Sequence, residues 1–149
     1  MNLTILGSQG AIPKINKFSS SHLLEISNTN ILIDCGEGTQ FQLKRNKIKL
    51  SKIEIILISH AHGDHYFGLI GLIATLSLLK REKKLKIYCP TSVLKIIQAH
   101  IKFSKLILSY DLQLIGLNSQ YSENIFENLF FTIRTSPLKH SVYTNGFII

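Results

Sequence analysis

Cysteine is scarce in this chain, and features of a secreted or membrane-bound protein are missing. The only cysteines among the 149 residues are Cys35 and Cys89, too few for a disulfide framework or a cysteine-rich zinc module. The longest nearly unbroken apolar segment, Tyr66–Leu79, has 14 residues, whereas a membrane-spanning helix needs about 20. The first residues contain no basic leader followed by a long apolar stretch, so no secretory signal is predicted. We therefore expect a cytoplasmic protein without membrane contact.

Acidic residues are also few. The chain has 9 Asp and Glu against 17 Lys and Arg, which gives a net charge of +8. A basic excess favours polyanionic partners such as nucleic acid. However, 14 of the 17 basic residues are lysine, and isoleucine and asparagine are also frequent. A compositional bias of the source genome therefore explains the charge equally well, and both explanations stay open.

Short apolar runs typical of strands alternate with helical segments along the chain. A length of 149 residues with 45% hydrophobic content suits one domain with a substantial core, and the alternation predicts an α/β fold with helices covering sheets. The turn residues Ser27–Asn30 predict a tight hairpin, and the charged run Lys80–Lys86 is interpreted as a solvated turn. Strands are expected at Leu3–Leu6, His22–Ser27, Asn30–Cys35, Ile53–Ser59, Lys86–Cys89, Tyr110–Leu117, Glu123–Asn128, Leu129–His140 and Asn145–Ile149, and helices at Gly38–Asn46, Asp64–Lys80 and Thr91–Ser104.

Four ionisable side chains are crowded into six residues, His60, His62, Asp64 and His65. They directly follow the apolar run Ile53–Ser59, which is typical of a strand buried on both faces, and ligands in α/β proteins gather where such strands end. His60 and His62 are two residues apart, so an extended backbone points both toward the same side. Gly63 allows a sharp reversal, and the remaining two groups fall in the first turn of the next helix.

Three imidazoles and a carboxylate at one bend repel or lose solvation unless they share a partner. A divalent cation is such a partner, because zinc accepts imidazole nitrogen and carboxylate oxygen and usually takes four ligands. The His-x-His-x-Asp-His cluster therefore predicts a metal site. It is the strongest functional signal in the sequence.

At these residues the chain resembles the metallo-β-lactamase superfamily, whose signature is His-x-His-x-Asp-His on an αββα sandwich. More narrowly it is similar to the ribonuclease Z family of tRNA 3′-processing endonucleases. Three further stretches carry the narrower resemblance: "DCGEGTQFQL" (34–43), "HYFGLIGL" (65–72) and "SPLKHSVYTNGF" (136–147). Residues 1–149 are then expected to be the N-terminal half of one metallo-β-lactamase-type domain, because the chain stops within an apolar, strand-like run.

The resemblance implies roles for individual residues. His60, His62 and His140 would hold one zinc ion, while Asp64 and His65 would contribute to a second. Asp64 would also accept a proton from the attacking water. Gly36 and Gly38 are interpreted as residues that shape the backbone, and Asp34 as a residue that supports a metal ligand. Lys14 and Lys17 lie in a loop that would face the RNA, although a flexible surface loop explains them nearly as well.

The reaction implied by the resemblance is hydrolysis of a phosphodiester in precursor tRNA, which leaves a 3′-hydroxyl on the tRNA and a 5′-phosphate on the trailer. A homodimer is also implied. The family's bridging aspartate, final histidine and tRNA-binding arm have no counterpart here, so we expect the isolated chain to bind zinc incompletely and cleave poorly or not at all. Two alternatives stay open: a thioesterase or lactamase of the same fold, and a non-catalytic half-domain that acts only with a partner chain.

Overall fold

The computed structural model describes residues 1–12 and 14–149 and confirms the α/β class. Its strands form a six-stranded sheet with the order β1-β2-β3-β4-β5-β6 and a three-stranded sheet with the order β7-β8-β9. The elements are β1 (Asn2–Gly7), β2 (Ser21–Ile26), β3 (Thr29–Ile33), α1 (Thr39–Arg45), the short 3₁₀ helix η1 (Leu50–Lys52), β4 (Ile53–Leu57), α2 (Gly63–Tyr66), α3 (Leu69–Leu78), β5 (Leu85–Pro90), α4 (Thr91–Ser104), β6 (Leu112–Leu117), β7 (Glu123–Glu127), β8 (Thr132–Leu138) and β9 (Thr144–Ile148).

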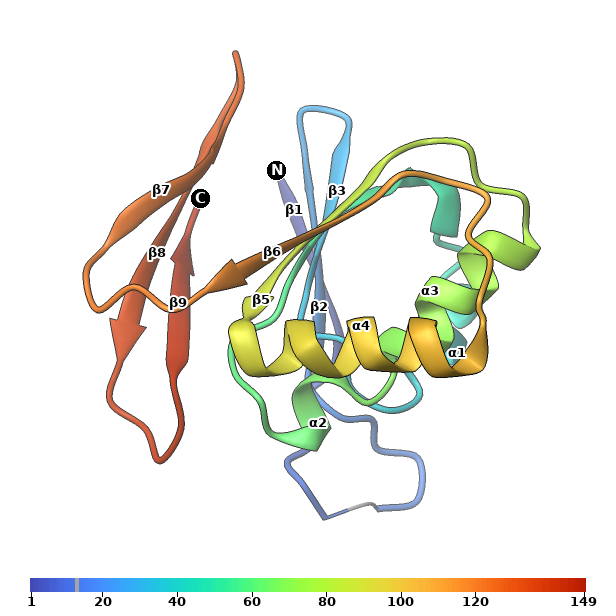
Figure 1. Ribbon diagram of the computed structural model, residues 1–149, viewed down its shortest axis with the longest axis horizontal. Helices are drawn as coiled ribbons and strands as arrows, with labels where there is room; N and C mark the ends of the chain where they lie inside the picture. Colours follow the sequence, from blue (N-terminus) through green and yellow to red (C-terminus); the bar gives the residue numbers. More distant parts are fainter. Residues whose placement is uncertain (13) are drawn as a thin grey trace.

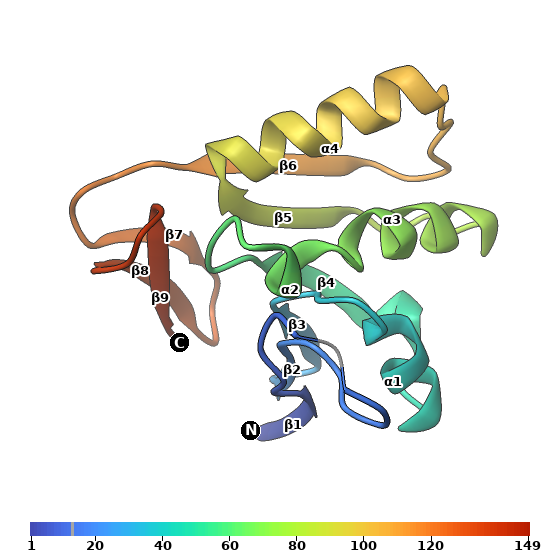
Figure 2. The ribbon, with the colours of Figure 1, turned by 90° about the horizontal axis from the view of Figure 1, so that it is seen from below.

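The molecule is layered, with helices on one face of the large sheet and the small sheet on the other (Figures 1 and 2). The segment from β4 to Ile58 shows why its sequence is apolar except at Glu54. Ile56 and Ile58 belong to the core beneath the helices, whereas Ile55 and Leu57 belong to the core between the two sheets. Side chains of a strand alternate between faces, so consecutive positions are apolar where both faces are covered, and the one charged residue, Glu54, is part-exposed and pairs with Lys83 at 3.5 Å. The expectation that this strand is buried on both faces is confirmed.

The strand pairing places the ends of several parallel strands at one edge of the large sheet. β1, β2 and β3 pair antiparallel, and β3, β4, β5 and β6 pair parallel. The hairpin between β2 and β3 is confirmed: Ser27 and Asn28 have φ values of 47° and 64°, as a two-residue turn between twisted strands requires. The parallel strands are joined through helices, and the candidate site follows the carboxyl end of β4.

The single helix expected at Asp64–Lys80 is wrong, because the segment forms two helices, α2 and α3. The backbone N–H of Gly68 donates to the carbonyl of Cys35 at 2.9 Å, and a Cβ at Gly68 would lie 2.2 Å from the Gly36 oxygen. The break therefore lies where two backbone segments touch. In the part of the chain that the structure describes, no helix combines the length and apolarity needed to cross a membrane.

The charged run Lys80–Lys86 is only partly a solvated turn, because Arg81 is buried with 4% of its surface exposed. Its guanidinium donates to the carbonyls of Lys83 at 2.6 Å, Lys84 at 2.8 Å and Ser51 at 3.2 Å. A cationic side chain can be buried when its donors are satisfied in this way. The arginine thus fixes the loop before β5 against the segment before β4.

The strand expected at Leu129–His140 is shorter at both ends, since β8 spans Thr132–Leu138. At its start, the Asn128 side-chain oxygen accepts the backbone N–H groups of Phe130 at 2.8 Å and Phe131 at 2.9 Å. An asparagine that binds the following backbone favours a turn over a strand. At its other end, the chain leaves the sheet before His140, so this histidine lies in the loop between β8 and β9.

Candidate metal centre

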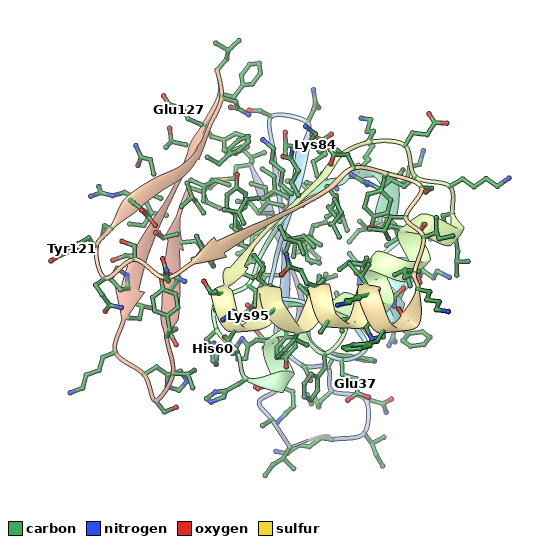
Figure 3. The ribbon with its side chains drawn as sticks, in the orientation of Figure 1. Glu37, His60, Lys84, Lys95, Tyr121 and Glu127 are labelled. Atoms are coloured by element: carbon green, nitrogen blue, oxygen red, sulfur yellow. The ribbon has the colours of Figure 1, made fainter. Side chains whose placement is uncertain are left out.

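The histidine cluster lies where the chain leaves β4. His60 is 7% exposed, and it comes three residues after the last residue of β4. In Figure 3 it lies at the end of the molecule that also carries α2 and Glu37, whereas Lys84, before β5, lies at the opposite end. The cluster thus occupies the carboxyl edge of the parallel strands, where ligands commonly bind in α/β sheets.

His62 and His140 complete a group of three imidazoles around His60. The ring centroids are 4.8 Å apart for His60 and His62, 4.8 Å for His60 and His140, and 5.0 Å for His62 and His140. One nitrogen from each ring lies within 4.8 Å of the others. The prediction that His60 and His62 point to the same side is confirmed, and the structure also brings His140 to them.

His140 reaches this group because the two sheets meet at the site. The chain forms an isolated antiparallel bridge between His60 and Thr144, and the backbone N–H of Asn145 donates to the carbonyl of Ser59 at 2.9 Å. The end of β4 is thereby held against the start of β9. The loop before β9 then carries His140 over the end of β4.

Asp64 and His65 form a second group of donors beside the first. They lie in α2, where the Nε2 atom of His65 is 3.4 Å from the Oδ2 atom of Asp64. The rings of His60 and His65 have centroids 3.9 Å apart. The structure therefore brings all five predicted ligand residues, His60, His62, Asp64, His65 and His140, to one place.

The expectation that Gly63 makes the sharp reversal through a backbone conformation open only to glycine is wrong. Gly63 is not among the described glycines with positive φ, and the reversal instead arises because His62 is extended, at φ −77° and ψ 141°, directly before the first helical residue. A Cβ there would lie 2.2 Å from two atoms of the Phe67 ring, so a larger residue would displace that ring, which is 64% exposed. By contrast, Gly38 has φ +82°, as expected for a residue that shapes the backbone.

Asp34 binds His65 directly. Its Oδ2 atom accepts from Nδ1 of His65 at 2.6 Å and from the hydroxyls of Ser59 at 3.1 Å and Ser20 at 3.2 Å, and its Oδ1 atom accepts the Ser59 backbone N–H at 2.8 Å. Asp34 is 5% exposed and has φ 58°, a left-handed conformation that Asp and Asn adopt more readily than other non-glycine residues. The carboxylate thus sets the orientation of His65.

Ser59 is a site residue that the sequence did not single out. Its hydroxyl oxygen lies 3.0 Å from Nδ1 of His60 and 3.3 Å from Nδ1 of His65. If the hydroxyl donates to Asp34, it accepts from Nδ1–H of His60, while His65 donates its Nδ1–H to the same carboxylate. This assignment leaves Nε2 of each ring with a free lone pair, which is the form that binds a cation. A serine before a histidine carries no pattern that would have indicated this role.

Burial and neighbouring charges set the protonation of two of these histidines in opposite directions. For His60, burial and then the nearby His65 and His62 rings lower the pKa to about 4. For His65, burial also lowers the pKa, but the hydrogen bond and charge of Asp34 outweigh it and raise the pKa overall. His60 is therefore neutral at pH 7, as a metal ligand must be.

The donor set fits a divalent cation. Imidazole nitrogens from three different positions converge, one of them on a ring that is neutral at pH 7, and a carboxylate with a further imidazole adjoins them. This mixture of nitrogen and oxygen donors matches the ligand preference of zinc. The supporting hydrogen bonds to Nδ1 are those that orient histidine ligands in metal sites.

A pocket of about 930 Å³ opens beside His62 and Asp64, and its lining includes Lys17. Lys14 is not among the described residues that line it, although its carbonyl accepts the backbone N–H of Lys17 at 3.1 Å. The structure thus brings one of the two predicted substrate lysines to the site. The pocket also contains phenylalanines that the sequence did not indicate as functional.

Comparisons with known proteins agree with this architecture. The family described as "Anti-Pycsar protein Apyc1" matches residues 1–134. Ribonuclease Z of Phocaeicola vulgatus is 37% identical over 144 residues, which cover 97% of this chain and 47% of that protein. The crystal structure of the short form of human tRNase Z matches with a TM-score of 0.87 and 31% identity, covering 99% of this chain and 64% of that one. The metallo-β-lactamase-fold protein YhfI of Bacillus subtilis has a TM-score of 0.73 at 22% identity, covering 97% and 56%.

These matches confirm both the fold class and the family resemblance. The match to YhfI supports the metallo-β-lactamase fold alone, because its sequence identity is low. The curated relatives named ribonuclease Z are 35–40% identical over nearly the whole chain, and the chain spans about half of their length. The chain therefore belongs to the family of the anti-Pycsar protein Apyc1, has the metallo-β-lactamase fold and is a homologue of ribonuclease Z.

Proposed function

We propose that this chain carries the metal-binding part of a zinc-dependent endoribonuclease that removes 3′ trailers from tRNA precursors. One observation carries the proposal: the nitrogens of His60, His62 and His140 converge within 4.8 Å, beside the Asp64–His65 pair, at the end of β4. The relatives named ribonuclease Z supply the reaction class and the substrate.

The two donor groups would hold two zinc ions. His60, His62 and His140 would bind one, and Asp64 with His65 would supply part of the sphere of the other. When bound, such ions lower the pKa of a water molecule to about 7 and neutralise charge on the attacking and leaving oxygens of a phosphodiester. Imidazole and carboxylate donors are those that zinc prefers.

The remaining chemistry belongs to side chains of this chain. Asp64 would accept a proton from the water that attacks phosphorus. As the new bond from water oxygen to phosphorus forms, the bond from phosphorus to the 3′ oxygen breaks, and that oxygen takes a proton from solvent. The products are a 3′-hydroxyl on the tRNA and a 5′-phosphate on the trailer. Asp34 would hold His65 in place through the bond at 2.6 Å to Nδ1. Ser59 would do the same for His60, since its hydroxyl lies 3.0 Å from that ring.

Substrate recognition would depend on phosphate contacts and on the folded shape of the RNA. Lys17 lines the pocket beside His62 and Asp64 and would meet a phosphate close to the cut. Lys14 lies three residues before Lys17, whose backbone N–H donates to the Lys14 carbonyl, and it would contact the RNA strand farther from the cut. The net charge of +8 has the sign that such binding requires, and affinity that falls steeply with added salt would support this assignment.

We further propose that residues 1–149 form one part of a single metallo-β-lactamase-type domain, and that the protein works in the cytoplasm as a homodimer. Large apolar side chains on outer strands support association with another polypeptide: Leu3 and Ile5 on β1 are 56% and 64% exposed, and Ile148 on β9 is 60% exposed. The buried free thiols of Cys35 and Cys89 suit a reducing compartment. Sedimentation velocity measures the association directly, and a monomer at all concentrations would contradict it.

The metal assignment is tested by comparing His62→Ala with His100→Ala. Both remove one histidine, but His100 is exposed on α4 and is not among the described groups that could hold a metal. We expect zinc content and the zinc-dependent rise in melting temperature to fall sharply in His62→Ala alone, because bound metal stabilises only the folded state. Equal zinc content in the two variants would contradict the assignment.

The reaction is tested with a 3′-extended tRNA precursor labelled at each end. The chain is assayed alone and mixed with the part of the Phocaeicola vulgatus ribonuclease Z that it does not match. Zinc-dependent release of the trailer with a 5′-phosphate, lost in His62→Ala, is the expected result. A lactam and a thioester assayed in parallel test the other two hydrolase reactions, and turnover of either without RNA cleavage would overturn the proposal.

A further inference from the structure

Three phenylalanine rings line the pocket beside the candidate metal centre. Phe18 comes from the loop before β2, Phe41 from α1 and Phe67 from the turn between α2 and α3. Phe41 and Phe67 are 74% and 64% exposed. Single exposed apolar residues are common on protein surfaces. Three aromatic rings that meet at one pocket, next to His62, form an apolar patch of the kind that marks a binding site.

Two of the rings lie over glycines. A Cβ at Gly63 would lie 2.2 Å from the Cε2 and Cζ atoms of Phe67, and a Cβ at Gly38 would lie 2.7 Å from Cδ1 of Phe18. Each ring therefore packs directly on a glycine in the chain. The Phe67 ring also meets the Tyr66 ring edge-on, with centroids 5.1 Å apart.

The position of Gly63 places the Phe67 ring beside the candidate metal centre. Gly63 is flanked in the chain by His62 and Asp64, two of the predicted metal ligands. The ring that packs on it lines the same pocket as these two ligand residues. Lys17 lines the same pocket and offers a positive charge to an adjacent phosphate.

We propose that Phe18, Phe41 and Phe67 form an aromatic wall on which the unpaired nucleobases next to the cleaved phosphodiester stack. This inference rests on the proposed nuclease function. Each nucleobase has a flat face that stacks on aromatic side chains whatever its sequence, and in a duplex those faces are already covered by neighbouring bases. The occupant is therefore a single strand. Glu37, which also lines the pocket, disfavours phosphate and can accept from a base amino group.

The aromatic wall is tested with Phe41→Leu and Phe67→Leu, which keep an apolar side chain and remove the ring. The matched control is Phe103→Leu, because Phe103 is 81% exposed on α4 and does not line the pocket. The probes are a short RNA strand with 2-aminopurine beside its central phosphodiester and an abasic strand of equal length and charge. Binding is measured in EDTA, which prevents cleavage.

We expect the parent chain to bind the base-containing strand at least tenfold more tightly than the abasic strand and to quench 2-aminopurine fluorescence. Each pocket variant should reduce this preference by about fivefold or more, since stacking contributes roughly 1–3 kcal/mol per base. The preference should stay within twofold of the parent value in Phe103→Leu. Unchanged melting temperatures, measured by circular dichroism, would show that the variants remain folded.

Four results would overturn the aromatic wall: equal affinity of the parent for the two strands, an unchanged preference in both pocket variants, adenosine monophosphate binding as tightly as the strand, or pocket variants that alter self-association while RNA binding is unchanged. Failure of the proposed nuclease function is distinguishable. It would appear as no zinc uptake and no precursor cleavage while the preference for bases persists, whereas failure of the wall leaves zinc uptake intact.

Discussion

Replacing Asp34 with asparagine should both destabilise the fold and weaken the second donor group. Asparagine has nearly the same shape and tolerates the left-handed φ of 58° at this position, so backbone strain is not introduced. One amide oxygen can still accept the Ser59 backbone N–H. The amide nitrogen then occupies the place of Oδ2, which accepts from Ser20, Ser59 and His65 in the parent.

The size of the effect follows from which of these donors can adapt. The two serine hydroxyls can rotate and accept from the new NH₂ group, but Nδ1–H of His65 then faces a donor. The lost bond, 2.6 Å long and made to a carboxylate, belongs to a class that contributes about 1.5–3 kcal/mol. For a domain of this size, that loss lowers the melting temperature by roughly 5–10 °C.

The substitution should also change the chemistry of His65. Burial is the largest influence on its pKa and lowers it, and Asp34 is what raises the pKa overall. Without that charge the pKa should fall, and the ring should place its proton on Nε2, because Nδ1 then faces the amide NH₂. A protonated Nε2 cannot bind a cation, so zinc affinity of the second group should drop by about 10- to 100-fold.

The measurement is urea unfolding of the metal-free chain by far-ultraviolet circular dichroism, followed by zinc titration. The matched control is Asp111→Asn, which removes a carboxylate whose side chain is 56% exposed and pairs with Lys84 at 3.2 Å. A surface pair of this kind contributes at most about 1 kcal/mol. If Asp34→Asn and Asp111→Asn had the same unfolding free energy and zinc affinity, the role assigned to Asp34 would be refuted.

Two further predictions concern buried groups away from the site. Arg81→Ala should lower the free energy of unfolding by about 2–4 kcal/mol, because it leaves three carbonyls without their donor. The control Arg134→Ala, at an exposed position, should change this free energy little. Equal effects of the two substitutions in urea titrations would contradict the prediction. Burial raises the pKa of the Cys35 and Cys89 thiols from 9.0 to about 12, so at pH 8 the native thiolate fraction falls about a thousandfold. Iodoacetamide should label both only after denaturation, and rapid labelling of the native chain would be inconsistent with their burial.

The strands were predictable wherever local pattern and tertiary environment agree. β4 is apolar at consecutive positions because both of its faces are buried, and the β2–β3 hairpin follows from turn residues that accept positive φ. The break between α2 and α3 was not predictable. It depends on the contact of Gly68 with the backbone of Cys35 and Gly36. An apolar helical pattern gives no information about a contact with a segment that is distant in the sequence.

In the candidate site, too, some residues were predictable from the sequence and others were not. His60, His62, Asp64 and His65 are close in sequence, so their convergence follows from one strand end and one helical turn. The supporting groups come from elsewhere: Ser20 and Asp34 reach the site from separate segments, with Asp34 at 31 residues from His65. The aromatic pocket likewise combines three separate elements. Only the fold brings such residues together, and their individual types are too common to indicate a site.

His140 shows most clearly what depends on tertiary structure. It belongs to the loop after β8, in the small sheet, whereas His60 and His62 follow β4 of the large sheet. The bridge from His60 to Thr144 and the bond from Asn145 to the Ser59 carbonyl join the two sheets at this point. Any cation shared by the three imidazoles therefore links the sheets, and its binding free energy adds to the stability of their packing. Metal affinity and the docking of the small sheet are thus coupled, because the group of three imidazoles is complete only when the small sheet places His140 beside His60 and His62.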